Sequence, residues 1–181
     1  QAYLRRFHNL ADCTLVPTEG LRQQLRAAGF ERLIVVQRGV DVDRFTPALR
    51  NPALRAVWGV QPGERVLLYV GRLAPEKNLE LLAAAYDAMQ AVQPGWRLVV
   101  VGDGPQRAWL AQRCPQAVLL GALTGEALAQ AYANGDLLAF PSLTETFGNV
   151  TLEALASGLP VLAFDYAAAA EVVRHGDSGL L

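Results

Sequence analysis

The chain has 181 residues, of which 52% are hydrophobic and 18% are charged, so it can bury about 70% of the surface that its unfolded form exposes. Its formal net charge of -1 excludes the basic surface of a nucleic-acid-binding protein and the polybasic patch of a membrane-surface protein. No apolar run approaches the ~18–20 residues that span a bilayer and no charged-then-apolar leader is visible, so we expect a cytoplasmic protein without a transmembrane segment.

The first third of the chain predicts a short α/β segment followed by a turn-rich connector. The run GVDVDRFTP (39–47) is typical of turns, and the glycines at 59 and 63 mark a further break. The expected elements, in chain order, are a helix at 3–11, a strand at 13–17, a helix at 18–28 capped by Thr18, a strand at 34–37 and a polar helix at 49–57.

Five later segments are short and almost continuously apolar. Continuous rather than alternating hydrophobicity predicts strands that are covered on both faces, as in a parallel sheet. The segments are 66–70, 98–101, 118–120, 137–140 and 160–164.

Helical patterns lie between these strands. Asn78 can cap a first helix, and Thr124 can cap a second. The core-facing residues of the first helix are Leu79, Leu82, Ala83, Tyr86 and Met89, and those of the second are Leu128, Ala131 and Tyr132. A third helix should begin near Gly148, bury Leu152, Leu155 and Ala156, and end at Gly158. The alternation predicts an α/β fold with a doubly wound, Rossmann-like parallel sheet.

The organisation suggests three parts. Residues 64–181 form the main α/β unit, residues 37–63 connect it to what precedes, and residues 1–36 belong to another domain. The last run, HGDSGLL (175–181), is a turn that enters a strand which is cut short, so we expect the chain to be a fragment.

The loop GRLAPEKN (71–78) places two cations, Arg72 and Lys77, between an expected strand and a helix start. Cations beside the positive end of a helix are unfavourable unless an anion lies between them, which indicates a phosphate site. A solvent-facing loop in which Glu76 pairs with one cation explains the same residues equally well.

The run VGDGP (101–105) is similar to the glycine-rich turn of dinucleotide-binding folds, but the third glycine is missing. The pattern favours a tight strand-to-helix turn over a site for a hydride-transferring cofactor.

The stretch ETFGNVTLE (145–153) carries two carboxylates, Glu145 and Glu153, with seven residues between them. A helix that starts near Gly148 presents free backbone N–H groups to an oxygen-rich ligand. A carboxylate accepts hydrogen bonds from a pair of vicinal hydroxyls, so an acid on each side of such a helix start fits a nucleotide sugar. Two solvent-facing glutamates are the alternative for either residue taken alone.

Residues 34–181 resemble the C-terminal, donor-binding domain of the GT-B, family-4 retaining glycosyltransferases, also called group 1 glycosyltransferases. The most specific mark is the Glu-x7-Glu motif in ETFGNVTLE, followed by ALASGLPV. The supporting marks are GRLAPEKN, VGDGP, the run LLGALTGEALAQAYANGDLLAFPS (119–142), GVDVDRFTP and GDSGLL. The resemblance implies that residues 1–36 are the tail of the N-terminal acceptor domain, most of which is absent.

The chain departs from the family pattern at three places. Arg38 stands where asparagine is frequent, and Asn78 stands where glycine is frequent. Four alanines at 167–170 replace a small glycine-rich loop and remove the glycines that would allow a close backbone approach to the donor.

The resemblance implies catalytic roles for Arg72, Lys77 and Glu145. The two cations would hold the diphosphate as the sugar leaves, Glu145 would bind hydroxyls of the donor sugar, and Glu153 would hold the ribose. Further substrate contacts are implied for the helix start and for backbone that meets the phosphates or the base, at Phe147, Gly148, Asn149, Val150, Gly102, Leu119, Leu120 and Gly121.

The implied reaction is transfer of a hexosyl group, with retention of anomeric configuration, from a nucleotide sugar to a glycan or lipid-linked acceptor. The wording TETFGNVTLEALASG is most similar to bacterial α-mannosyltransferases that use GDP-mannose. No cofactor and no obligatory metal are implied, and Cys13 and Cys114 lie near no histidine pair that could complete a zinc site.

The acceptor would bind through the absent N-terminal domain, which could also hold the protein at the inner membrane face. We expect this chain to bind the nucleotide weakly and to transfer no sugar by itself, because domain closure assembles such sites. The alternatives are a nucleotide-sugar-binding module without catalysis and a nucleotide-sugar epimerase of the same architecture.

Overall fold

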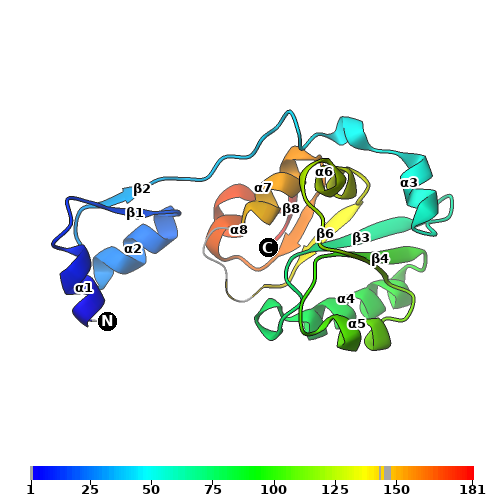
Figure 1. Cartoon of the computed structure of the whole chain (residues 1–181), viewed down its shortest axis with the longest axis horizontal. Helices are drawn as coiled ribbons and strands as arrows, with labels where there is room; N and C mark the ends of the chain where they lie inside the picture. Colours follow the sequence, from blue (N-terminus) through cyan, green and yellow to red (C-terminus); the bar gives the residue numbers. More distant parts are fainter. Residues whose placement is uncertain (1, 143, 145–147) are drawn as a thin grey trace.

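The computed structural model of the chain describes residues 2–142, 144 and 148–181 (Figure 1). Within these residues, the larger unit contains a six-stranded parallel sheet of order β5-β4-β3-β6-β7-β8, which confirms the predicted fold class and all five predicted strands. The strands are β3 Arg65–Val70, β4 Trp96–Val101, β5 Val118–Gly121, β6 Leu137–Phe140, β7 Val161–Ala163 and β8 Gly179–Leu180.

Alternate residues of the central strand β3 enter two separate cores. Val66, Leu68 and Val70 face a core shared with α6, α7 and α8, whereas Leu67 and Tyr69 face a core shared with α4 and α5. Both faces of the sheet are therefore covered, which explains why the strands are apolar without alternation. The helices of the larger unit are η1 Pro47–Leu49, α3 Pro52–Val57, η2 Pro75–Lys77, α4 Leu79–Val92, α5 Arg107–Arg113, α6 Gly125–Ala133, α7 Asn149–Ala156 and α8 Ala167–Val172.

All three residues predicted as caps occupy the N-cap position, but only one of the three forms a side-chain cap bond. Thr18 accepts a hydrogen bond from Leu21 N at 3.1 Å as predicted, but Asn78 and Thr124 occupy their N-cap positions without a side-chain cap bond. Asn78 instead has a φ of 54°, in the left-handed region that asparagine enters more readily than most residues. Ala167 also has a positive φ, of 51°. Two of the departures from the family pattern thus stand at positions whose backbone suits glycine.

The inner face of α7 also differs from the prediction. We expected Leu152, Leu155 and Ala156 to be buried, but the fully buried residues of this helix are Thr151 and Ala154. Small side chains on the inner face allow the helix to lie close to its neighbours. Leu155 and Ala156 pack at the margin of the core instead.

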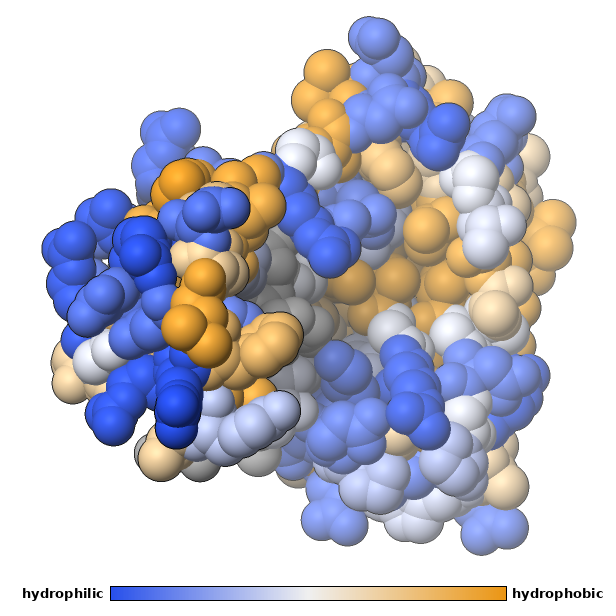
Figure 2. Space-filling model, turned by 60° about the vertical axis from the view of Figure 1, so that its left-hand side comes forward, coloured by the Kyte–Doolittle hydropathy of each residue, from blue (hydrophilic) through white to orange (hydrophobic). Residues whose placement is uncertain are grey.

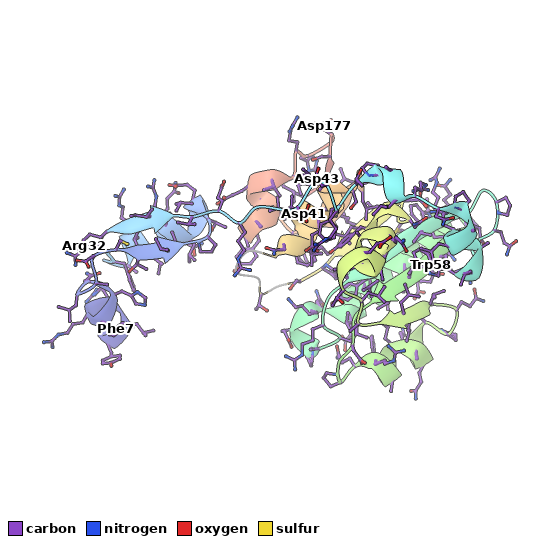
Figure 3. All side chains as sticks on the ribbon, turned by 45° about the horizontal axis from the view of Figure 1, so that its top comes forward. Phe7, Arg32, Asp41, Asp43, Trp58 and Asp177 are labelled. Carbon is purple, nitrogen blue, oxygen red and sulfur yellow. The ribbon has the colours of Figure 1, made fainter. Side chains whose placement is uncertain are left out.

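The N-terminal residues form a separate small unit that an extended segment joins to the larger one (Figure 1). Its strands β1 and β2 pair in parallel, and Phe7 and Arg32 both lie on it (Figure 3). Large apolar side chains such as Tyr3 and Phe7 are exposed there, and hydrophobic surface is visible on this unit (Figure 2). Its elements are α1 Ala2–His8, β1 Thr14–Val16, α2 Glu19–Ala27 and β2 Leu33–Val35.

The connector between the two units packs against the larger one at Val40 and is buried in it from Phe45 onward. Phe45, Trp58 and Val60 are buried in the same core as the first face of β3, and Trp58 lies on the larger unit (Figure 3). The predicted boundaries at residues 36 and 63 stay predictions. No helix in the part of the chain that the structure describes is long and apolar enough to cross a membrane.

Asp136, just before β6, ties the connector to the sheet. Its Oδ1 accepts from Arg50 at 2.5 Å, and its Oδ2 accepts from Arg55 at 2.8 Å and from the backbone N–H of Val66 at 2.7 Å. Burial by itself raises the pKa of Asp136, but the hydrogen bonds from Arg50, Val66 and Arg55 outweigh it, and the pKa lies below its ordinary value.

We predict that Asp136 contributes stability that acid removes. An unfolded aspartate titrates at about pH 3.9. A lower folded pKa means that the contribution of Asp136 is present above that pH and is lost as the pH falls through the folded pKa. Asp136→Asn should lower the free energy of unfolding at pH 7 by on the order of 2 kcal/mol and should flatten its fall below about pH 4 in urea titrations.

The matched control is Asp177→Asn. Asp177 pairs with Arg174 at 3.3 Å on the exposed turn before β8 (Figure 3), so its loss should leave the free energy of unfolding almost unchanged. Equal effects of the two variants would contradict the role given to Asp136.

Candidate functional site

The order of the strands reverses between β3 and β6. From β3 the chain moves outward through β4 and β5, and it then returns to place β6 on the other side of β3. In open parallel sheets, ligands bind outside the carboxyl ends of the strands at such a reversal. The loops that follow β3 and β6, at 71–78 and 141–148, are therefore the expected walls of a ligand site.

Lys77 joins these two loops. Its Nζ donates to Ser142 Oγ at 3.4 Å, and Ser142 Oγ in turn donates to the carbonyl of Thr144 at 3.3 Å. The ammonium group therefore lies against the segment that leads into α7. The sequence placed Lys77 in a phosphate loop but gave no sign of Ser142, because a serine after a strand is typical of any such loop.

The start of α7 supplies backbone donors. Gly148 occupies the N-cap with a φ of 47°, and Asn149 begins the helix. The first N–H groups of a helix have no acceptor within it, so those of Asn149 and Val150 are available to a ligand. The side-chain Oδ1 of Asn149 is buried without a hydrogen-bond partner among the described residues. The predicted residues Glu145 and Phe147 lie outside the described residues.

Arg72 is held by its backbone and not by its side chain. Tyr69 donates its buried hydroxyl to the carbonyl of Arg72 at 2.9 Å, whereas the Arg72 side chain is 68% exposed and lies 3.6 Å from Glu76. The pairing with Glu76 that we considered as the alternative is therefore present. An exposed pair of this kind contributes only about 0.2–1 kcal/mol, so a diphosphate, with its higher charge, can displace Glu76 from the guanidinium.

The glycines of VGDGP bring two loops into contact. A Cβ on Gly102 would lie 1.9 Å from the carbonyl oxygen of Gly71, and one on Gly104 would lie 2.4 Å from that of Leu73. Gly102 also donates its N–H to the carbonyl of Gly121 at 2.8 Å, which links the ends of β4 and β5. These contacts support the interpretation of a tight turn that needs glycine. A contact of Gly102 with a ligand stays a prediction.

The end of β5 carries an irregularity at the predicted base-contacting backbone. Val100 pairs with Leu119 and Val101 with Gly121, so Leu120 is an extra residue with no partner in register on β4. Bulges of this kind occur at sheet edges beside functional sites, where they redirect the backbone. Arg107 donates to the carbonyl of Leu119 at 3.3 Å and holds this strand end in place.

Glu153 has a buried partner that the sequence did not reveal. Tyr132, from α6, donates its hydroxyl to Glu153 Oε2 at 2.8 Å and is 0% exposed. Burial, together with the neighbouring Glu153 carboxylate, raises the pKa of Tyr132 above its ordinary value, so the hydroxyl stays protonated. The signal that could have found this pair is the need of a buried tyrosine hydroxyl for a hydrogen-bond partner.

Within the described residues, no three of His, Cys, Asp and Glu lie close enough together to hold a metal ion. Cys13 is exposed and Cys114 is buried, each as a free thiol. Metal independence stays a prediction.

An apolar hollow of about 190 Å³ lies where α4 meets the carboxyl ends of β6 and β7. Hydrophobic side chains gather in the recess of the larger unit (Figure 2). The described residues that line the hollow, such as Leu81, Phe140 and Leu162, carry no charge, so these walls do not suit a diphosphate.

Residues 64–181 match the family described as Glycosyl transferases group 1. The chain is 43% identical to the GDP-mannose-dependent alpha-mannosyltransferase of Mycobacterium tuberculosis, covering 99% of this chain and 46% of that protein. It is 36% identical to the protein of the same name from Corynebacterium glutamicum, covering 99% and 42%. The chain thus spans about half the length of these relatives or less.

Solved structures show the same fold. Anabaena HepE in complex with UDP and glucose matches with a TM-score of 0.83 at 26% identity, over 99% of this chain and 52% of that one. A sucrose-phosphate synthase from Thermosynechococcus elongatus matches with a TM-score of 0.83 at 27% identity, over 99% and 47%.

We predict that Gly102→Ala lowers the stability by more than backbone strain alone would, because the added Cβ would collide with Gly71. Gly102 has a φ of 137° and no room for a Cβ, whereas Gly63 has a φ of 88° and nothing within 4 Å of its Cβ position. Gly63→Ala should cost about 1–2 kcal/mol of backbone strain, and Gly102→Ala should cost about 1–3 kcal/mol more. Urea denaturation measures both, and equal losses would contradict the close approach of the two loops.

Proposed function

The chain belongs to the group 1 glycosyltransferases, and on this premise we propose that its larger unit binds the nucleotide sugar from which a hexosyl group is transferred with retention. The larger unit is the Rossmann-like C-terminal domain of the GT-B fold. The observation that supports the proposal most is the contact of Lys77 with the loop that leads into α7, at the reversal of the strand order.

The diphosphate is proposed to lie between Lys77, Arg72 and the first N–H groups of α7. Negative charge builds up on the leaving phosphate while the sugar takes on oxocarbenium character. Fixed cations and backbone donors that are already aimed at this charge stabilise the transition state more than the ground state. The same groups can supply the charge stabilisation without an obligatory metal, which is part of the proposal.

The two ends of the donor have separate places in the proposal. Glu145 binds hydroxyls of the sugar, Glu153 binds the ribose, and the irregular end of β5 meets the base. GDP-mannose is the proposed donor, because the 43% identical relative is named for it. The UDP and glucose of the Anabaena complex support a nucleotide sugar as the ligand class.

The acceptor is proposed to be a glycan or a lipid-linked glycan. It would bind to the domain of which the N-terminal unit is a part, across the cleft from the donor. A lipid-linked acceptor would bring the whole protein to the inner face of the membrane.

We predict that GDP raises the melting temperature of the chain more than UDP or ADP does, because a ligand that binds only the folded state stabilises it. Arg72→Gln should weaken GDP binding about ten- to hundred-fold, the loss expected for a charge-assisted hydrogen bond. Since the Arg72 side chain is exposed, the variant should fold normally. Isothermal titration calorimetry gives the dissociation constants.

The matched control is Arg113→Gln, which removes the same charge from α5, where Arg113 forms an exposed pair with Asp87 of α4. It should leave GDP binding unchanged. Equal weakening by the two variants would mean that GDP responds to net charge alone, and absence of binding to all three nucleotides by the unmodified chain would refute the proposed function.

A further inference from the structure

We propose that Tyr132 is a positioning residue that holds the Glu153 carboxylate ready for the ribose hydroxyls, and that Phe45 of the connector holds Tyr132. The inference rests on the proposed function, because it takes Glu153 to be the ribose contact. It adds two residues, from α6 and from the connector, that touch no substrate themselves.

The hydrogen bond between Tyr132 and Glu153 has a fixed direction. The Tyr132 hydroxyl is buried and remains protonated, so it donates, and Glu153 Oε2 accepts at 2.8 Å. Among the described residues, no group donates to the other oxygen, Oε1. One oxygen of the carboxylate is therefore bound by the protein while the other is available to a ligand hydroxyl.

This arrangement prepares Glu153 for binding. A free glutamate side chain loses rotational entropy when a ligand fixes it. The bond from Tyr132 restricts the carboxylate before the nucleotide arrives, so less entropy is lost on binding and the affinity for the ribose is higher. A residue with this effect should change the preference for ribose hydroxyls more than it changes the affinity for the remainder of the nucleotide.

Phe45 restricts the tyrosine ring in turn. The two rings meet edge to face, with centroids 5.7 Å apart and an interplanar angle of 77°, and both side chains are buried. The N–H of Phe45 donates to the carbonyl of Asp41 at 2.9 Å, within the connector turn that also carries Asp43 (Figure 3). The segment between the two units therefore packs directly on the residue that orients Glu153.

The test compares GDP with 2′,3′-dideoxy-GDP, which lacks both ribose hydroxyls, by calorimetry on the chain of 181 residues. The unmodified chain should prefer GDP by about ten-fold or more, as a hydrogen bond to a charged group predicts. Tyr132→Phe should reduce this preference several-fold by weakening GDP binding, with little change for the dideoxy form. In a Glu153→Gln background, where the preference is already lost, Tyr132→Phe should change nothing further.

Tyr86→Phe is the matched control. Tyr86 is also a buried tyrosine, and its hydroxyl donates to the carbonyl of Trp96 at 3.1 Å in the other core. Its loss should lower the stability to a similar extent and leave the preference for GDP unchanged. A merely structural role of Tyr132 would likewise lower stability without changing the preference.

The outcomes separate this inference from the proposed function. Binding of neither nucleotide by the unmodified chain refutes the proposed function. Binding without a preference for GDP overturns the inference together with the ribose contact proposed for Glu153, but leaves nucleotide binding in place. A preference that Tyr132→Phe leaves intact overturns the inference alone. If Tyr132→Phe fails to fold, Phe45→Leu is the deciding variant, because it keeps the Tyr132 hydroxyl but loosens the packing of its ring. A reduced preference for GDP then supports the inference, and an unchanged preference overturns it.

Discussion

The contact between Lys77 and the loop that leads into α7 is the interaction on which the site depends. It exists because β3 and β6 are neighbours in the sheet although they are far apart in the chain. The carboxyl ends of neighbouring parallel strands lie at the same end of the sheet, so the loop after β3 and the loop after β6 lie side by side there. A cation from one loop and the positive end of a helix from the other are thereby placed together, and both attract the negative charge of a diphosphate.

The remainder of the fold keeps this end of the sheet in place. A hydrophobic core packs on each face of the sheet, and Asp136 binds the connector to the strands at their amino ends. At the site itself, single hydrogen bonds take the place of the large apolar contacts. The Tyr69 hydroxyl binds the backbone carbonyl of Arg72, and the Tyr132 hydroxyl binds the Glu153 carboxylate. The connector contributes to both regions, since it also supplies Phe45.

The sequence predicted the sheet because burial on both faces leaves a continuous apolar pattern. It predicted the Thr18 cap because that bond is local, but not the left-handed Asn78, whose conformation is set by the tight passage from η2 into α4. The predicted inner face of α7 was wrong because helical spacing alone does not show which of two adjacent faces of a helix packs against the sheet. The partner of Glu153 comes from another helix, and such a pair follows from packing and not from spacing. Glu145 and Phe147 lie outside the described residues, so their roles stay predictions.

A crystal structure of the chain with GDP tests the central claim most directly. We predict that the diphosphate lies beside Lys77 and the first turn of α7, with the ribose hydroxyls on Glu153. A nucleotide bound elsewhere, for example over the apolar hollow lined by Leu162, with Lys77 turned away from its phosphates, would contradict it.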